Sequence, residues 1–368
     1  IKGDVVRAVT PPQRLDIGEG VTGVADILEE IARIYGYERI PETRMADELP
    51  PQIGNPSLEK EVRLQDLLVD IGLQEVVNYR LTSQEREARL GPSGEGEDGK
   101  PYVRLANPIA SDRDVLRHSL LSSVMEVLER NARLEQRMAL FEIGPVFYPA
   151  SESELPQELS RLAIAMTGPR SLSFWESQGS SAMDFYDMKG ALSELFRGLR
   201  IKGLHFEHGN SPAYHPGKCA LVSVNGQTLG YMGELHPLVR ERYDLPEMPL
   251  IAAELDLEKI LENIPDKYEV RPVPAYPPVL EDLAIIVDED IPAERVLGVV
   301  KEAGGSTLAD VRLFDVFRGE QIGEGKKSLA YSLSYQAPDR TLTDEEASKI
   351  RKRIVKRLDS ELGAKLRS

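Results

Sequence analysis

The segment "SLAYSLSY" (residues 328–335) alternates large apolar side chains with small ones, and this alternation decides the fold of the C-terminal part of the chain. Successive side chains of a strand point to opposite faces of a sheet. One face of this strand is therefore formed by Leu329, Tyr331, Leu333 and Tyr335. Around it the sequence predicts further strands at 283–287, 311–317 and 364–367 and helices at 292–304 and 343–363. The order β-α-β-β-α-β predicts a ferredoxin-like domain.

The middle of the chain mixes helices with strands that short turns connect. The segment "SLEKEVRLQDLLVDIG" (57–72) predicts an amphipathic helix with Ser57 as its N-cap. The segment "CALVSVNGQTLGYMGEL" (219–235) predicts two strands joined at Asn225-Gly226, because both residues tolerate a positive φ. Hairpin-connected strands with interspersed helices predict an antiparallel α+β fold.

The composition limits what the chain does. No apolar run approaches the roughly 20 residues that cross a bilayer, so we expect no membrane partner. One cysteine, Cys219, excludes an intrachain disulfide framework, and we expect a cytoplasmic location. The net charge of −16 repels phosphate backbones, so nucleic-acid binding requires a local basic patch. Residues 272–368 are nearly neutral, with 15 Lys and Arg against 17 Asp and Glu.

The helix predicted in "VADILEEIARIYGYERIP" (24–41) has acidic groups in its first turn: Asp26, Glu29 and Glu30. With Asp26 as N-cap, Glu29 completes a capping box, which requires no further function. Alternatively, a loop brings Asp16 of "RLDI" to the same point. Several carboxylates in one place repel each other unless a cation neutralises them, and a hard oxygen site suits Mg²⁺. Spacing alone favours capping and leaves the metal site as the alternative.

The last predicted helix carries a basic stripe at helical spacing, formed by Lys349, Lys352, Arg353 and Lys356. Such a stripe is usually a solvated face, here partly paired by Glu345. On an otherwise acidic chain it is also the place where an RNA backbone would find its contacts.

Several segments occur in the order in which one family has them: "DILEEIARIYGYERIP", "LANPIASDRDVLRHSLL", "LFEIGPVF", "FYDMKGALSELF", "HPGKCALVSVNGQTLGYMGELHP", "LFDVFRGEQIGEGKKSLAYSL" and "GAKLR". Together they resemble the C-terminal half of the bacterial phenylalanine–tRNA ligase β subunit. The resemblance implies the C-terminal part of a B5 domain at 1–45, a class II synthetase catalytic-like domain at 55–265 and a ferredoxin-fold anticodon-binding domain at 275–368. It also implies that tRNA-binding and editing modules would lie before Ile1.

The resemblance further implies two sets of binding residues. In the family, carboxylates of the B5 domain bind Mg²⁺ with help from the α subunit. The matching positions here are Asp16, Asp26, Glu29 and Glu30, although the insert "IGEGVTGVA" (17–25) is longer than in the family. The family reads the tRNA-Phe anticodon with positions that match Asp315, Ser328 and Arg367. From the basic stripe we add Lys349 and Arg353 as candidates for RNA binding.

The same resemblance implies that this chain is not catalytic. A class II site clamps the phosphates of ATP with arginines, one of them in a motif resembling F-R-x-E. In the matching segment "LFEIG", Phe141 and Glu142 are adjacent and the arginine is missing. We therefore expect no catalytic residue here. The α subunit would charge tRNA-Phe with phenylalanine in an ATP-dependent reaction, within a heterotetramer of two α and two β subunits. The alternative is a free-standing, synthetase-derived RNA-binding or scaffold protein without an α partner.

Overall fold

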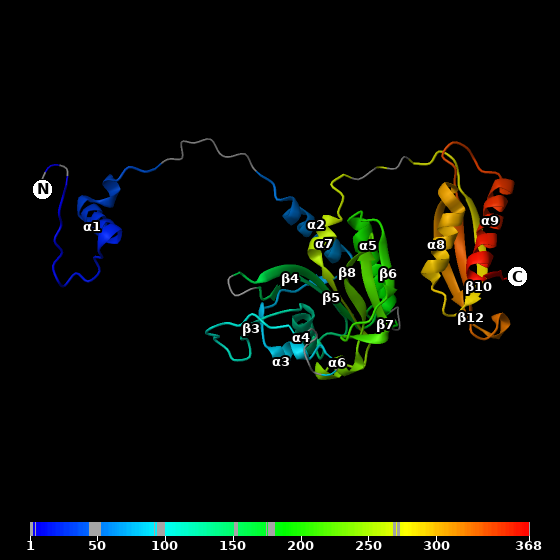
Figure 1. Ribbon diagram of the computed structural model, residues 1–368, viewed down its shortest axis with the longest axis horizontal. Helices are drawn as coiled ribbons and strands as arrows, with labels where there is room; N and C mark the ends of the chain where they lie inside the picture. Colours follow the sequence, from blue (N-terminus) through cyan, green and yellow to red (C-terminus); the bar gives the residue numbers. More distant parts are fainter. Residues whose placement is uncertain are drawn as a thin grey trace. The chain divides into compact units, whose positions relative to one another are not determined.

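The computed structural model describes residues 3, 5–43, 53–91, 93, 100–150, 154–173, 175, 181–267, 270 and 273–367. The chain divides into two compact units, Ile1–Pro265 and Asp266–Ser368 (Figure 1). The domain boundaries expected from the sequence stay predictions.

The second unit has the predicted ferredoxin-like topology. Its elements are β10 (Val279–Asp288), α8 (Ala293–Gly304), η2 (Gly305–Thr307), β11 (Leu308–Phe317), η3 (Glu320–Ile322), β12 (Lys326–Tyr335), α9 (Asp344–Leu362) and β13 (Lys365–Leu366). The strands form one antiparallel sheet in the order β11-β12-β10-β13. This confirms the order of elements that the alternation in β12 predicted.

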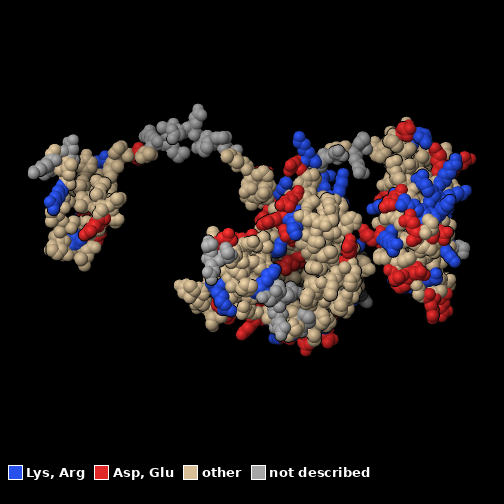
Figure 2. Space-filling view, in the orientation of Figure 1, with Lys and Arg blue, Asp and Glu red and all other residues tan. Residues whose placement is uncertain are grey.

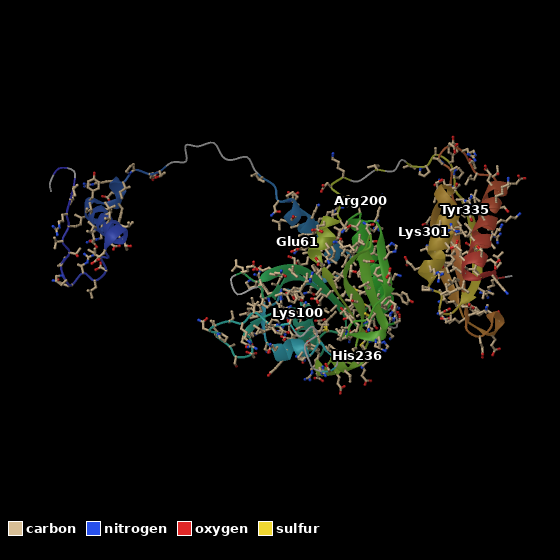
Figure 3. The ribbon with its side chains drawn as sticks, in the orientation of Figure 1. Glu61, Lys100, Arg200, His236, Lys301 and Tyr335 are labelled. Atoms are coloured by element: carbon tan, nitrogen blue, oxygen red, sulfur yellow. The ribbon has the colours of Figure 1, made fainter. Side chains whose placement is uncertain are left out.

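One face of this sheet is covered by both helices, as Figure 1 shows. The four large residues of β12 are at most 1% exposed and pack with apolar residues of α8 and α9, among them Val296 and Ile354. Tyr335, labelled in Figure 3, belongs to this buried layer. Burial of a side chain of this size contributes about 1.5–3 kcal/mol. The small residues of β12 face the opposite side, which neither helix covers.

The first unit contains a seven-stranded sheet in the order β1-β4-β5-β9-β8-β7-β6. Its strands are β1 (Gln74–Glu75), β4 (Met138–Tyr148), β5 (Gln157–Thr167), β6 (Leu204–His208), β7 (Tyr214–Val224), β8 (Gln227–Leu235) and β9 (Leu250–Asp256). Only the β1–β4 pair of this sheet is parallel. The antiparallel α+β class that the sequence predicted is thereby confirmed. The β7–β8 turn lies at Asn225 and Gly226, with φ of 51° and 80°.

Two separate apolar cores lie on the faces of this sheet. One is built with α2 (Pro56–Asp70), α5 (Phe185–Gly198) and α7 (Leu257–Glu262). The other is built with α4 (Leu121–Asn131) and α6 (Pro237–Arg242). A small two-stranded sheet, β2 (Leu81–Thr82) with β3 (Val115–Leu116), and the short helix α3 (Gln84–Ala88) complete the unit.

Helix α1 (Gly20–Tyr35), followed by η1 (Tyr37–Arg39), starts earlier than the sequence predicted. Asp26 lies inside the helix, and the N-cap is Glu19, whose side chain makes no capping hydrogen bond. The predicted capping box of Asp26 and Glu29 is therefore wrong. A Cβ at Gly23 would lie 2.1 Å from the Gly18 carbonyl oxygen, so only glycine allows the segment before the helix to pack this closely against its first turn. Glycine, a weak helix former, is required here by the close approach of the backbone.

The start of α2 also corrects a prediction. Its N-cap is Asn55, whose side-chain oxygen accepts a hydrogen bond from the Leu58 N–H at 3.2 Å. Ser57, the predicted N-cap, lies within the first turn, after Pro56 at the first helical position. Proline is favoured there because its missing N–H has no partner in a helix in any case.

Replacing Asn55 by Ala should lower the free energy of unfolding by about 1 kcal/mol, because one N–H of the first turn loses its partner. The matched change Ser57→Ala should alter it by less than about 0.5 kcal/mol. Urea unfolding of both variants measures the difference. A larger effect at Ser57 than at Asn55 would contradict the assigned cap.

Candidate nucleic-acid interface

The uncovered face of the four-stranded sheet gathers the three predicted anticodon-reading residues. Ser328 of β12 lies directly opposite Phe317 of β11, and Ala330 lies opposite Asp315. Residues that oppose each other in an antiparallel pair share a face. Ala330 and Ser328 belong to the uncovered side, so Asp315 and Phe317 belong to it as well.

Arg367 joins this face from the edge strand. Its N–H donates to the carbonyl of Ala284 in β10 at 3.0 Å, which continues the β13 pairing. The guanidinium lies 3.5 Å from the Ser328 hydroxyl oxygen, and its carbon lies 4.7 Å from the centre of the Phe317 ring. An arginine over an aromatic face is attracted by the ring quadrupole. Ser328, Arg367 and Phe317 thus form one contact group.

Phe317 is the member of this group that the sequence analysis missed. It stands two residues after Asp315, so period-2 alternation already places both on one face. A β-bulge between Leu313 and Asp315 interrupts the register just before them. Past the bulge, Val316 pairs with buried Leu329 and points to the helix side.

The two candidates from the basic stripe lie on α9, on the other side of the sheet. The guanidinium of Arg353 donates to the carbonyls of Ala303 at 2.6 Å and Gly304 at 3.0 Å. A cation that bonds the last carbonyls of a helix stabilises its C-terminus, here that of α8. Lys349 is exposed on α9. The structure therefore does not bring Lys349 or Arg353 together with the open-face residues.

The predicted metal ligands near α1 contact arginines. Arg14 donates to Asp16 at 2.6 Å and to Glu30 at 2.7 Å, and Arg33 donates to Glu30 at 2.5 Å. The Arg14 hydrogen bond lowers the pKa of Asp16 to about 2, and Arg33 and Arg14 together lower the pKa of Glu30. These carboxylates are thus held ionised by guanidinium groups.

The other two acidic residues do not join them. The Asp26 carboxylate accepts from the Gly18 N–H at 2.8 Å, and Glu29 is exposed. Within the described residues, no three His, Cys, Asp or Glu groups are placed to hold a metal ion. Carboxylate oxygens suit Mg²⁺, but a guanidinium lies between two of these four. In this arrangement the predicted ligands do not fit a magnesium site.

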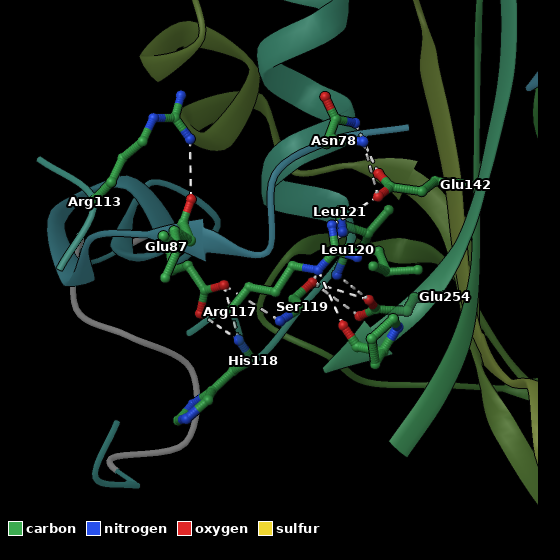
Figure 4. Close-up of polar contacts among 12 residues, drawn as sticks. Asn78, Glu87, Arg113, Arg117, His118, Ser119, Leu120, Leu121, Glu142 and Glu254 are labelled. Carbon is green, nitrogen blue, oxygen red and sulfur yellow. Dashed lines mark hydrogen bonds and ion pairs between the residues drawn. The ribbon is translucent and has the colours of Figure 1, made fainter. Parts of the chain in front are cut away.

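In the first unit, the glutamate of the segment "LFEIG" has a structural role in a buried ion pair. Glu142 of β4 pairs with Arg117 at 2.7 Å, and both side chains are 2% exposed (Figure 4). Glu142 also accepts from the Asn78 side-chain amide at 2.8 Å and from its N–H at 3.3 Å. Removing one partner of such a buried pair costs about 3–5 kcal/mol. The Arg117 guanidinium is therefore held by Glu142 and is not available to a ligand.

Two further carboxylates, the buried Glu87 and the partly buried Glu254, hold the segment that leads into α4. Glu254 of β9 accepts from the Leu120 N–H at 2.6 Å and from the Ser119 hydroxyl, and Glu87 of α3 accepts from the N–H groups of His118 and Ser119. Negative charge is favourable at a helix N-terminus. Burial nevertheless raises the pKa of Glu87 to about 7 and raises that of Glu254.

The same carboxylates line a pocket of about 350 Å³. Its wall includes a ring stack in which His118 lies between Tyr102, at 3.9 Å, and Tyr148, at 4.6 Å. The Lys100 ammonium lies 4.6 Å from the Tyr148 ring centre. Two acidic groups in a partly enclosed site disfavour a triphosphate.

Residues 40–257 match the sequence model described as the phenylalanyl tRNA synthetase beta chain CLM domain. The chain belongs to the phenylalanyl-tRNA synthetase β-chain family. Residues 274–367 match the ferredoxin-fold anticodon binding domain. The open face described above therefore lies within the segment that this second family covers.

Curated relatives are named phenylalanine–tRNA ligase β subunit. One from Symbiobacterium thermophilum is 39% identical over 99% of this chain and 40% of its own length. One from Moorella thermoacetica is 40% identical over 94% of this chain and 43% of its own. One from Clostridium acetobutylicum is 35% identical over 100% of this chain and 44% of its own. The chain thus spans about two fifths of the length of the β-chain relatives it matches.

The helices that the structure describes include none long and apolar enough to cross a membrane. The cysteine in the described part, Cys219, is buried, and burial raises the pKa of its thiol. A protonated, enclosed thiol is a poor nucleophile.

The titration of Glu87 predicts a pH dependence of stability. Its pKa rises from 4.5 in the unfolded chain to about 7 in the fold. The folded state therefore binds this proton more tightly, and the stabilisation present below about pH 4.5 is lost as the pH rises through about 7. The free energy of unfolding is therefore lower above about pH 7 than below about pH 4.5, by on the order of 3 kcal/mol.

The variant Glu87→Gln does not titrate, so its stability should fall less than that of the unmodified chain between about pH 5 and about pH 8. Urea unfolding at both pH values measures this difference. Identical pH dependence in the two proteins would contradict the raised pKa.

Proposed function

We propose that this chain is a non-catalytic part of a phenylalanine–tRNA ligase β subunit and that its second unit binds the anticodon of tRNA-Phe. The observation that supports this most directly is the contact group of Phe317, Arg367 and Ser328 on an uncovered sheet face. A partly exposed ring flanked by hydrogen-bonding side chains suits unpaired bases, which stack on aromatic or guanidinium planes and offer their edges.

Each residue of this face has a distinct role in the proposal. Phe317 provides the stacking surface, and Arg367 either extends that surface or pairs with a phosphate. Ser328 is buried beside Arg367, so its hydroxyl donates or accepts a hydrogen bond at a base edge only when Arg367 turns toward the RNA. Asp315, exposed two residues before Phe317, accepts from a base amino group and repels phosphates, which favours bases over backbone at this point.

The first unit acts in this proposal as a scaffold without ATP chemistry. The strand that would carry the phosphate-binding arginine has Glu142, and the buried guanidinium nearby is paired with it. The pocket of about 350 Å³ that contains the His118 ring stack is lined by two acidic residues, Glu87 and Glu254. Since a triphosphate needs cationic partners, adenylate formation and acyl transfer belong to the α subunit.

The proposed docking surface for the α subunit includes the segment between β1 and β2. Val77 and Tyr79 are 87% and 76% exposed and line a groove of about 410 Å³ with Arg113, Glu126 and Arg130. Exposed apolar side chains rimmed by charged ones are typical of protein–protein contacts. A shared magnesium site remains part of the proposal only for the complex, since in this chain the carboxylates do not fit one.

The variant Phe317→Ala should weaken binding of a tRNA-Phe transcript by about 1–3 kcal/mol, because a stacked base loses its platform. It should weaken binding of a transcript with an altered anticodon less. The matched control Val316→Ala changes the neighbouring side chain on the helix side and should leave both affinities near those of the unmodified chain. Equal effects of the two variants would contradict anticodon reading by the open face.

Mixed with the cognate α subunit, the chain should form a stoichiometric complex in size-exclusion chromatography, whereas the chain alone should not charge tRNA. Magnesium should raise the melting temperature of the complex but not of the chain, and Glu29→Gln with Glu30→Gln should reduce that rise. Charging by the chain alone would refute the division of labour. Failure to form a complex would favour the free-standing RNA-binding alternative.

A further inference from the structure

A groove of about 560 Å³ runs between α9 and β13 in the second unit. Its floor is formed by the apolar residues Val355, Ala364 and Leu366. Four cationic side chains line it, Arg351, Lys352 and Lys356 from the helix and Lys365 from the strand. Among the described residues that line the groove, Asp359 is the one carboxylate. The groove is therefore strongly basic on a chain whose net charge is −16.

The tight turn that ends α9 brings the helix and β13, the two sides of the groove, close together. Gly363 follows the helix in the left-handed conformation, with φ of 62°, and its N–H bonds the Asp359 carbonyl. Two residues later β13 begins alongside β10. Glycine takes this conformation without the strain that a Cβ would add. As a result, Lys365 lines the same groove as cations about two to three turns back from the helix end.

Some other cations of the same unit are paired with carboxylates. Arg340 pairs with Glu346, Arg357 pairs with Glu302 and Glu361, and Arg318 pairs with Glu289. Among the hydrogen bonds and ion pairs that the structure describes in the second unit, none involves the side chain of one of the four groove cations. Figure 2 shows Lys and Arg gathering over α9. Four such cations at one place repel each other, and an anion would relieve that repulsion.

We infer that this groove binds the phosphodiester backbone of the RNA whose bases the open face reads. The inference rests on the proposed function and adds to it a separate site. β13 connects the two, because Lys365 lines the groove and Arg367, two residues later, contacts Ser328 on the open face. An RNA strand that leaves the open face across this edge meets the groove next.

The spacing and chemistry of the groove suit a backbone. Lys352 and Lys356 are one turn apart, about 6 Å along the helix axis, which is close to the separation of successive phosphates on a strand. Lysine acts as a point charge on phosphate and carries no base preference. The floor of Val355 and Leu366 offers apolar contact to ribose. The groove therefore contributes affinity and strong salt dependence, whereas the open face contributes sequence discrimination.

The test measures binding of the full chain to two transcripts, tRNA-Phe and the same RNA with an altered anticodon, over a range of salt concentrations. The variant is Lys352→Gln with Lys356→Gln, at two exposed helix positions. The matched control is Arg295→Gln with Lys301→Gln, which removes the same charge from exposed positions of α8, where Figure 3 labels Lys301. Circular dichroism melts verify that both variants fold.

The groove variant should weaken binding of both transcripts by the same factor, about tenfold at low salt. The slope of log affinity against log salt should fall by about 1.4–1.8, which corresponds to two lost phosphate contacts. The ratio of the two affinities should stay unchanged. A groove variant that matches the α8 control in affinity and slope overturns the inference, and so does one that changes the ratio instead.

The proposed function can fail separately. If Phe317→Ala leaves discrimination intact while the groove variant lowers the salt slope, the groove binds backbone and the open-face assignment is wrong. If the unmodified chain binds neither transcript at low salt, both ideas fail.

Discussion

The second unit depends on the burial of one face of β12 against α8 and α9. Side chains of a strand alternate between the two faces of the sheet. A slip of β12 by one residue would therefore turn all four large side chains toward water, so burial fixes the register. That burial therefore also fixes what lies on the other side. Ser328 and, through strand pairing, Phe317 and Asp315 are placed on the uncovered face by the same contacts that stabilise the core. Stability and the candidate interface are two consequences of one alternation.

In the first unit, charged residues are used for structure. Glu142 and Arg117 neutralise each other inside the protein, and Glu87 and Glu254 hold the backbone that starts α4. Buried charges of this kind are stabilising only while each keeps its partners. In the described part of this unit, the buried Arg117 guanidinium is thus paired with Glu142 and is not available to bind phosphate. This agrees with a scaffold role in which another subunit supplies the active site.

The sequence predicted the α+β class and the ferredoxin-like order, because periodicity and turn residues are local signals. It failed where helix ends depend on contacts. The sequence predicts the start of α1 at Asp26, whereas the helix begins at Gly20, and its Gly23 packs closely against the Gly18 backbone. For α2 the sequence predicted Ser57 as the cap, whereas in the structure the side chain of Asn55 makes the capping hydrogen bond.

For the candidate sites, the sequence by itself determined which residue types stand at each face of β11 and β12, since alternation requires no knowledge of distant residues. Which cations are free to bind a ligand was decided by the tertiary structure. Arg353 and Lys352 are neighbours with the same charge, yet α8 lies against one and the groove against the other. The partner of a charged side chain is set by distant segments of the chain, and a linear pattern contains no distances between them.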